Sequence, residues 1–480
     1  MITKIEIDGF KTFNNFKIEL SPFVIIAGAN GSGKSNLFDA ILLLSRLAET
    51  DLKSAFQEQR GEARELFTQY PDGNYAKQMR FIVEVLVDRE VKDSWGGEKK
   101  LKYTRLKYTL EISRDKDKRG LDRLYITKEE LLPIKKATDK WCKHYAKRDY
   151  WIPKIKGGRN VAFINTEPDT EKRIPTIYLR QDGTRGGKPS RADEVEQTVL
   201  SGVANTEFPH AFAMREEMRR WKLLQLNPVK LRKPSPILAK DFIGADGSNL
   251  PAALARMKAE DLYVTKDISR EINNLLPGIT AIDVEEDRSK DQYVLISISQ
   301  DGRKFSSRVL SEGTLRVLAL LVFKLDIQHK GVLCFEEPEN GIHPFRLENL
   351  TTLLRELASD FENEEEQDIP LRQLIINTHP PILVGNFFKN HELDCNILYA
   401  TLFSKVDPQK KQALRFTKMI PVTVHPAQSL FDFGDITEQE QKITLSEVQK
   451  YLQTKDFEGV LTPLLSQYNK MKTKKFVKIG

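Results

Sequence analysis

Three short apolar runs dominate the hydrophobic pattern of the chain. They occupy residues 23–27, 331–335 and 372–379, and they are rich in Val, Ile and Leu. Runs of this length without alternation are typical of strands that are buried on both faces of a parallel sheet. Residues 36–44 and 315–322 instead have helical character. The pattern therefore predicts an α/β protein.

The turn between the first strand and its helix carries the strongest motif. It reads Gly28-Ala29-Asn30-Gly31-Ser32-Gly33-Lys34-Ser35 and matches the phosphate-binding loop G-x-x-x-x-G-K-[ST]. Glycines allow backbone N–H groups to converge on phosphate oxygens, and the helix start adds its dipole. We expect Lys34 to reach the outer phosphates and the Ser35 hydroxyl to bind Mg²⁺. A glycine-rich turn with a chance lysine is the alternative, and the flanking strand and helix argue against it. The predicted nucleotide-binding residues here are Asn30, Gly31, Ser32, Gly33, Lys34, Ser35 and Asn36.

Two acids, Glu336 and Glu337, follow the second apolar run. Catalytic groups of parallel sheets gather at the carboxyl ends of the strands, where these side chains are expected. We assign Glu336 to the metal, through a water molecule, and Glu337 to the water that attacks the phosphate. Taken alone, two acids after a strand are usually a solvated strand end. Their meaning depends on the other segments.

The third run ends at His379, and a further segment, Leu310-Ser311-Glu312-Gly313-Thr314, precedes the second helix. His379 is predicted to contact the γ-phosphate as charge develops on it, although a structural histidine is the commoner reading of such a position. Ser311 and the Gly313 amide could form a second anion site, or Ser311 could be an ordinary N-cap. Two phosphate-binding helix starts suggest that one serves a neighbouring subunit.

Together, in this order, the four segments resemble the ATP-binding-cassette superfamily, in its SMC, RecF and OLD-like branch. Residues 7–13 resemble the I-x-x-F-K-S-F opening of that branch, with Thr12 in place of serine. The chain is most similar to stand-alone prokaryotic predicted ATPases of the kind found in PARIS- and Septu-like phage-defence systems. Three residues depart from the superfamily pattern, namely Glu312 and Thr314 in the signature segment 310–314 and Glu336 at an aspartate position.

The resemblance implies a fold, a reaction and an assembly. The fold is an ABC-type P-loop ATPase head, and the cofactors are ATP and Mg²⁺. Lys11 is implied to approach the nucleotide. ATP bound near Lys34 of one copy would be capped by Ser311 and Gly313 of a second copy, in a head-to-tail homodimer. Glu337, His379 and Lys34 would catalyse hydrolysis, which reopens the pair.

Composition narrows the setting of the chain. Its 480 residues, 40% hydrophobic and 30% charged, describe a soluble globular protein of two or more domains. The net charge of +7 permits nucleic acid without demanding it. No apolar run reaches the roughly 18 residues of a membrane-spanning helix. The three cysteines, Cys142, Cys334 and Cys395, lack disulfide or metal-ligand spacing, so we expect a reducing, cytoplasmic location without a membrane.

A large α+β insertion is predicted between the phosphate-binding loop and the signature segment. The expected divisions are an N-terminal half of the head (1–90), the insertion (91–240), a C-terminal half of the head (241–400) and a small tail domain (401–480). Strands are expected at 105–112 and 121–126, and an exposed helix at 214–221.

Residues 135–159 of the insertion interleave cations with aromatic rings. The cations are Lys140, Lys143, Lys147, Arg148, Lys154, Lys156 and Arg159, and the rings are Trp141, Tyr145, Tyr150 and Trp151. Such a surface could follow a nucleic-acid backbone and stack on bases, or dock an acidic protein. It could equally be a solvated face whose rings pack inward.

Three functions remain open at this point. The favoured one is the sensor or regulator ATPase of an antiviral defence system, which controls a separate nuclease or toxin effector. This preference rests on the resemblance and on the lack of a nuclease pattern in residues 401–480. The alternative is a RecF/SMC-like DNA-binding ATPase of DNA repair or maintenance. The third is a regulatory ATPase without nucleic acid.

Overall fold

A computed structural model describes residues 1–117, 119–146, 151–153, 162–168, 175–181, 187–192, 195–343, 346–363, 370–390, 396–407, 412–422, 440 and 447–448. By its internal contacts the chain divides into two compact units. The first unit comprises 1–221, 360–371 and 393–480, and the second comprises 222–359 and 372–392. The expected boundaries at residues 90, 240 and 400 stay predictions.

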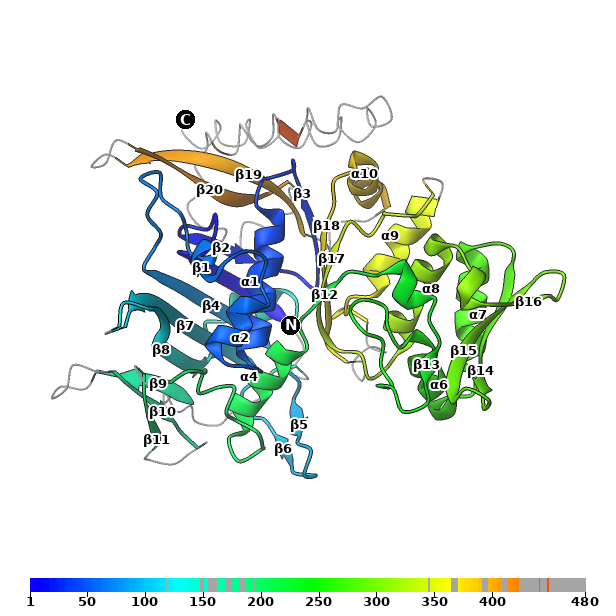
Figure 1. Ribbon diagram of the computed structural model, residues 1–480, viewed down its shortest axis with the longest axis horizontal. Helices are drawn as coiled ribbons and strands as arrows, with labels where there is room; N and C mark the ends of the chain where they lie inside the picture. Colours follow the sequence, from blue (N-terminus) through cyan, green and yellow to red (C-terminus); the bar gives the residue numbers. More distant parts are fainter. Residues whose placement is uncertain are drawn as a thin grey trace. The chain divides into compact units, whose positions relative to one another are not determined.

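The first unit contains an eight-stranded antiparallel sheet (Figure 1). Its strand order is β11-β10-β9-β8-β7-β4-β1-β2. Polar and apolar residues alternate along most of these strands, as expected for a sheet with one face in the core. The strands expected at 105–112 and 121–126 are confirmed as β7 and β8. The bounds are β1 (Ile2–Asp8), β2 (Phe16–Glu19), β4 (Gln78–Leu86), β7 (Arg105–Lys116), β8 (Asp122–Pro133), β9 (Ile164–Glu167), β10 (Thr176–Leu179) and β11 (Lys188–Arg191).

A second group of strands in this unit carries the phosphate-binding loop. The fully buried strand β3 (Phe23–Ala27) pairs in parallel with β19 (Asn396–Asp407), which pairs antiparallel with β20 (Gln412–Pro421). The parallel strand predicted at 23–27 is therefore confirmed. The helix that follows the loop is α1 (Lys34–Leu47), and it contacts α2 (Leu52–Gln57) and α4 (Pro209–Arg219). The remaining elements are η1 (Ala63–Leu66), β5 (Glu90–Lys92), β6 (Glu98–Lys100) and α3 (Lys140–His144).

The second unit has a parallel sheet and a smaller antiparallel one. In the parallel sheet β17 (Gly331–Glu336) lies between β12 (Lys222–Leu224) and β18 (Arg372–Asn377), so the strands predicted from the second and third apolar runs are confirmed. The antiparallel sheet holds β13 (Ser235–Pro236), β14 (Ile279–Asp287), β15 (Gln292–Ser299) and β16 (Lys304–Ser306). The helices are α5 (Pro228–Leu231), α6 (Leu250–Glu260), α7 (Val264–Leu275), η2 (Ser307–Val309), α8 (Glu312–Leu325), α9 (Leu347–Glu356) and α10 (Pro381–Asn390).

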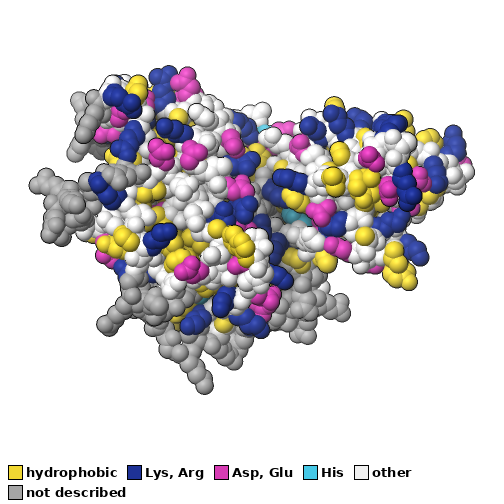
Figure 2. Space-filling view, turned by 60° about the horizontal axis from the view of Figure 1, so that its bottom comes forward, with side chains coloured by type: hydrophobic (Ala, Val, Ile, Leu, Met, Phe, Trp, Pro, Cys, Tyr) yellow, Lys and Arg dark blue, Asp and Glu magenta, His cyan; other side chains and the backbone are white. Residues whose placement is uncertain are grey.

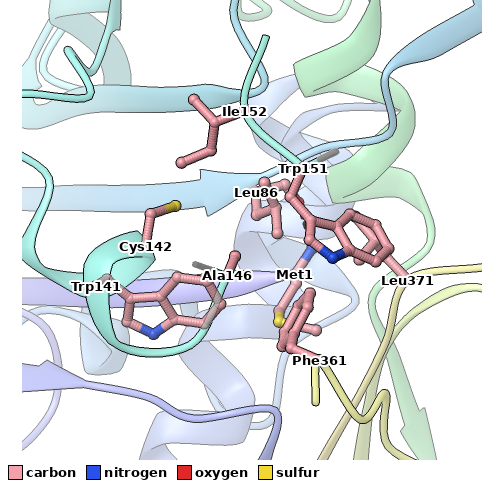
Figure 3. Close-up of a cluster of buried hydrophobic side chains, with 9 residues drawn as sticks. All are labelled: Met1, Leu86, Trp141, Cys142, Ala146, Trp151, Ile152, Phe361 and Leu371. Carbon is pink, nitrogen blue, oxygen red and sulfur yellow. Dashed lines mark hydrogen bonds between the residues drawn. The ribbon is translucent and has the colours of Figure 1, made fainter. Parts of the chain in front are cut away.

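Of the aromatic residues of the basic stretch 135–159, Trp141 and Trp151 are buried and Tyr145 is half-buried. Trp141 and Trp151 are only 4% and 7% exposed, and both rings meet Phe361 edge-on (Figure 3). The Trp141 ring also lies under the guanidinium of Arg105, which pairs with Asp139 at 2.6 Å. Rings in a core cannot stack on bases, so of the three readings the inward-packed one holds for these two tryptophans.

Other members of that stretch cannot be placed. Lys147, Arg148, Tyr150, Lys154, Lys156 and Arg159 lie outside the described residues. Over the face drawn in Figure 2, Lys and Arg side chains are interspersed with Asp and Glu side chains.

The prediction of an exposed helix at 214–221 is wrong. Met214, Met218 and Trp221 are at most 2% exposed, and the carboxylate of Glu217 is buried against the Trp221 Nε1–H at 3.1 Å. The charged residues between them suggested a solvated helix. The apolar spacing i, i+4 of the two methionines is what decides the buried face.

Across the described ranges, none of the helices has both the length and the apolar character needed to span a membrane.

Candidate nucleotide-binding site

The phosphate-binding loop, residues 28–35, is a tight turn between β3 and α1. Gly33 caps α1 with a φ of 92°, in the left-handed region that glycine adopts without strain. Lys34 opens the helix and is buried, and its Nζ donates to the carbonyl oxygens of Gly28 at 2.6 Å and Ala29 at 2.8 Å. The ammonium group is thus aimed into the loop itself, where a phosphate oxygen would compete for it.

The strands β19 and β20, here called the C-terminal hairpin, pack directly on this loop. A Cβ atom on Gly28 would lie 2.5 Å from the Ala400 carbonyl oxygen of β19. A Cβ atom on Gly33 would lie 2.0 Å from the Thr417 Oγ1 of β20. Both distances are shorter than any real carbon–oxygen contact, so glycine is required at both positions by packing as well as by φ.

The other predicted loop residues differ in exposure. Asn30 and Gly31 are exposed, and Ser35 and Asn36 are half-buried. The Ser32 Oγ is buried and has no hydrogen-bond partner in the protein. A hydroxyl that is buried without a partner is costly, and a phosphate oxygen would accept its proton. The loop therefore fits the group that its motif predicts.

Lys11 lies in the first unit close to α1. Its backbone has a φ of 45°, and its Nζ lies 2.7 Å from the Asp39 Oδ2 on α1. Arg60 approaches the other oxygen of the same carboxylate at 3.6 Å. Asp39 was not singled out in the sequence, because it reads there as one polar residue of an amphipathic helix. A direct role of Lys11 at the nucleotide stays a prediction.

The second unit brings two of the predicted catalytic residues together. Glu336 ends β17 beside Asn377 of β18. Glu337 then leaves the strand with a φ of 48°, a conformation that a non-glycine residue rarely adopts. Its carboxylate accepts a 2.6 Å hydrogen bond from the Asn340 side chain and lies 3.5 Å from the His379 Nε2.

Another acid, Glu339, lies near Glu337 and His379, and the sequence analysis assigned it no role. Glu339 is buried, and its Oε1 accepts a 2.9 Å hydrogen bond from the Thr378 hydroxyl, next to His379. Burial raises the pKa of the Glu339 carboxyl, and the nearby charge of Glu337 adds to the increase. Its other oxygen is buried without a hydrogen bond. The sequence feature that could have indicated Glu339 is its position two residues after Glu337.

The signature segment begins helix α8. Ser311 is the N-cap of α8, and its Oγ accepts the Thr314 N–H at 3.1 Å and pairs with the Thr314 hydroxyl at 2.7 Å. The N-cap role left open by the sequence is therefore present. A Cβ atom on Gly313 would lie 2.6 Å from the Gly341 carbonyl oxygen, so the segment packs against the residues that follow Glu337. An additional anion-binding role for Ser311 and Gly313 stays a prediction.

The metal assignment concerns Ser35 of the first unit and Glu336 of the second. Hydroxyl and carboxylate oxygens are the hard ligands that Mg²⁺ prefers, usually one or two of them together with substrate phosphates and water. Within the described part of the chain no three His, Cys, Asp or Glu side chains gather into a metal site. The assignment of Ser35 and Glu336 to the metal stays a prediction.

Two family models match separate stretches of the chain. A family model described as “RecF/RecN/SMC N terminal domain” matches residues 1–134. Another, described as “AAA domain, putative AbiEii toxin, Type IV TA system”, matches residues 187–385. No curated protein matches the chain.

Solved structures of SMC heads are similar at low identity. An SMC head bound to the C-winged helix domain of ScpA is 15% identical, covers 88% of this chain and 98% of its own, and has a TM-score of 0.47. A head with an extended coiled coil, bound to the C-terminal domain of ScpA derived from Pyrococcus furiosus, is 13% identical, with 93% and 99% covered and a TM-score of 0.44. The head domain from Thermotoga maritima is 13% identical, with 88% and 99% covered and a TM-score of 0.36.

The two family models cover the phosphate-binding loop, the signature segment, and the strands that precede Glu337 and His379. These motifs occur in the order typical of the superfamily, on an α/β fold with the expected strands. Over residues 1–134 and 187–385 the chain is therefore similar to SMC/RecF-like ATPase heads of the ABC type.

Proposed function

We propose that the chain binds ATP with Mg²⁺ and hydrolyses it as a switch between an open and a closed state. The observation that carries this proposal is the cluster at Glu337, whose carboxylate is held by Asn340 and lies beside His379. A carboxylate fixed in this way can orient and deprotonate a water molecule, and the imidazole can stabilise charge on the γ-phosphate. Ser35 and Glu336 are the metal ligands in this proposal, and a bound Mg²⁺ would supply further charge stabilisation.

The closed state in this proposal is a head-to-tail homodimer. The signature segment of one copy would cap the ATP on the phosphate-binding loop of the other. Ser311 is exposed at the start of α8, so its helix terminus is accessible to a second molecule. ATP then stabilises the closed state because it contacts both copies, and hydrolysis removes the γ-phosphate that joins them.

In the cell we propose a sensor or regulator ATPase of antiviral defence that controls a separate nuclease or toxin. Support comes from the toxin–antitoxin description of the family model that matches residues 187–385. DNA maintenance is the second candidate, supported by the RecF/RecN/SMC description of the model for residues 1–134. The burial of Trp141 and Trp151 removes two rings that a DNA-binding surface in the insertion would have used.

Nucleotide binding and phosphate release test the shared core. Lys34→Ala removes the loop cation, so we expect ATP binding to be lost, with the exposed Lys53→Ala as a matched control. Glu337→Gln replaces the carboxylate with a carboxamide of nearly the same shape that cannot act as a base, so ATP should bind while hydrolysis falls about 10²–10⁴-fold. Here the exposed Glu286→Gln is the control. Tight ATP binding by Lys34→Ala, or normal turnover by Glu337→Gln, would refute the proposal.

The Glu337→Gln variant also separates the two cellular roles. Purified with ATP from its native host, it should retain a stoichiometric nuclease or toxin-like protein if the chain regulates an effector. Recovery of nucleic acid alone, released by raised salt, would favour DNA maintenance instead.

A further inference from the structure

The C-terminal hairpin reaches the phosphate-binding loop through hydroxyl groups. Thr417 of β20 is only 1% exposed, and its Oγ1 lies 3.0 Å from the Ser32 carbonyl oxygen of the loop. The same oxygen lies 2.7 Å from the Thr12 Oγ1, which in turn lies 2.8 Å from the Asn36 Nδ2 at the start of α1. Residues from three separate segments of the sequence thus form one continuous series of hydrogen bonds.

The direction of every hydrogen bond in this series is fixed by chemistry. A carbonyl oxygen only accepts, so Thr417 spends its single hydroxyl proton on Ser32. Thr12 must then donate to Thr417, and its oxygen accepts the amide proton of Asn36. The hydrogen bonds therefore run from Asn36 to Thr12, from Thr12 to Thr417 and from Thr417 to Ser32, and each hydroxyl both donates and accepts. Hydrogen bonds arranged in this way polarise one another.

The two threonine hydroxyls of this hydrogen-bond series pack against Gly33, the residue that caps α1. A Cβ atom there would meet the Thr417 oxygen at 2.0 Å and the Thr12 oxygen at 2.9 Å. A backbone hydrogen bond from the Thr417 N–H to the Thr12 carbonyl oxygen, 2.9 Å, holds the two threonines in register. The conformation of the loop is therefore determined from outside the loop.

We infer that the C-terminal hairpin is a working part of the nucleotide site, with Thr417 as a positioning residue that holds the phosphate-binding loop in its binding conformation. The inference rests on the proposed ATP binding and adds to it a positioning residue that lies outside the loop motif. By linkage, a loop ordered by Thr417 favours ATP, and bound ATP stabilises the hairpin to the same extent.

The test compares two buried threonines of the same hairpin. Thr417→Val removes the donor at nearly constant volume, so we expect ATP affinity to fall about tenfold, while Thr417→Ser restores it. Thr401→Val on β19 is the matched control, because its hydroxyl bonds Glu447 at 2.8 Å and not the loop. Thermal unfolding of each variant separates lost affinity from lost folding.

Two further readouts distinguish positioning from mere packing. The double variant Thr12→Val, Thr417→Val should bind ATP no worse than either single variant, because either substitution alone already interrupts the series of hydrogen bonds. ATP should slow amide hydrogen exchange in β20 of the wild type but not of Thr417→Val. Wild-type affinity in a folded Thr417→Val, or an equal loss in Thr401→Val, would overturn the inference. A wild type that fails to bind ATP would instead refute the proposed function.

Discussion

Glu337 stands at a position where the backbone must leave the strand. With a φ of 48° it turns out of β17, and its N–H still donates to the Asn377 carbonyl oxygen of β18 at 2.8 Å. A non-glycine residue held in this region stores strain of order 1–3 kcal/mol, which the surrounding structure must offset. In this backbone conformation the carboxylate lies beside His379.

Asn340 is expected to determine where the Glu337 carboxylate points. Asn340→Ala removes the 2.6 Å hydrogen bond to Oε2, and a bond to a charged group contributes about 1.5–3 kcal/mol. We therefore predict a fall in kcat of about 10- to 100-fold at nearly unchanged KM for ATP, since the loss affects the water and not the nucleotide. Steady-state phosphate release measures both constants. The exposed Asn349→Ala on α9 is the control, and an unchanged kcat in Asn340→Ala would remove its assigned role.

At the scale of elements, the sequence predicted the strands that carry the site and missed much of what surrounds them. Apolar runs bounded by polar residues are local signals, so β3, β17 and β18 could be predicted. Thr417 and Asp39 could not, because their roles come from contacts that no sequence window contains. The helix α4 was misjudged because its charges outnumber the two methionines that fix its buried face.

The start of α8 allows the two readings of Ser311 to be separated. Ser311→Ala removes an N-cap and should lower the free energy of unfolding by about 1 kcal/mol. Ser311→Asn retains a capping oxygen, so its stability should stay close to that of the wild type. If Ser311 also caps ATP in the partner, both variants should still bind ATP as single copies but lose ATP-dependent association. Light scattering with ATP measures this, and normal association of Ser311→Asn would leave Ser311 a structural N-cap only.

The turn at residues 198–201 is tied to β8 by a buried acid. Glu129 accepts the Val199 and Leu200 N–H groups and the Tyr108 hydroxyl at 2.7, 2.8 and 3.0 Å. Burial raises the pKa of its carboxyl from 4.5 to about 7. Because the folded pKa is the higher one, the stabilising contribution is complete below pH 4.5 and is lost as the pH rises through 7.

Denaturant unfolding at several pH values tests this linkage. As the pH rises from 4.5 to 7, the titration of Glu129 should lower the free energy of unfolding by up to about 1.4 kcal/mol per pH unit. Glu129→Gln does not titrate, so its curve should be flatter than that of the wild type by this slope. Glu130→Gln, one residue along β8, should follow the wild type. Parallel curves for Glu129→Gln and the wild type would contradict the raised pKa.

At the scale of the whole molecule, the proposed switch depends on two incomplete sites that complete each other. The phosphate-binding loop belongs to the first unit and the signature segment to the second. In a head-to-tail pair, each ATP would use the loop of one copy and the signature segment of the other. Two variants that are inactive for different reasons should then complement each other when mixed.

We predict this outcome for Lys34→Ala mixed with Ser311→Arg. Each homodimer has two defective sites, whereas a mixed pair places the intact loop of one copy against the intact signature segment of the other. At equal concentrations half of the pairs are mixed and each has one working site, so activity should recover to about a quarter of the wild-type rate. Phosphate release after mixing in ATP measures the recovery. A mixture whose rate is only the sum of its two components would show that each copy hydrolyses ATP alone, and the head-to-tail assembly would have to be abandoned while the site at Glu337 could stand.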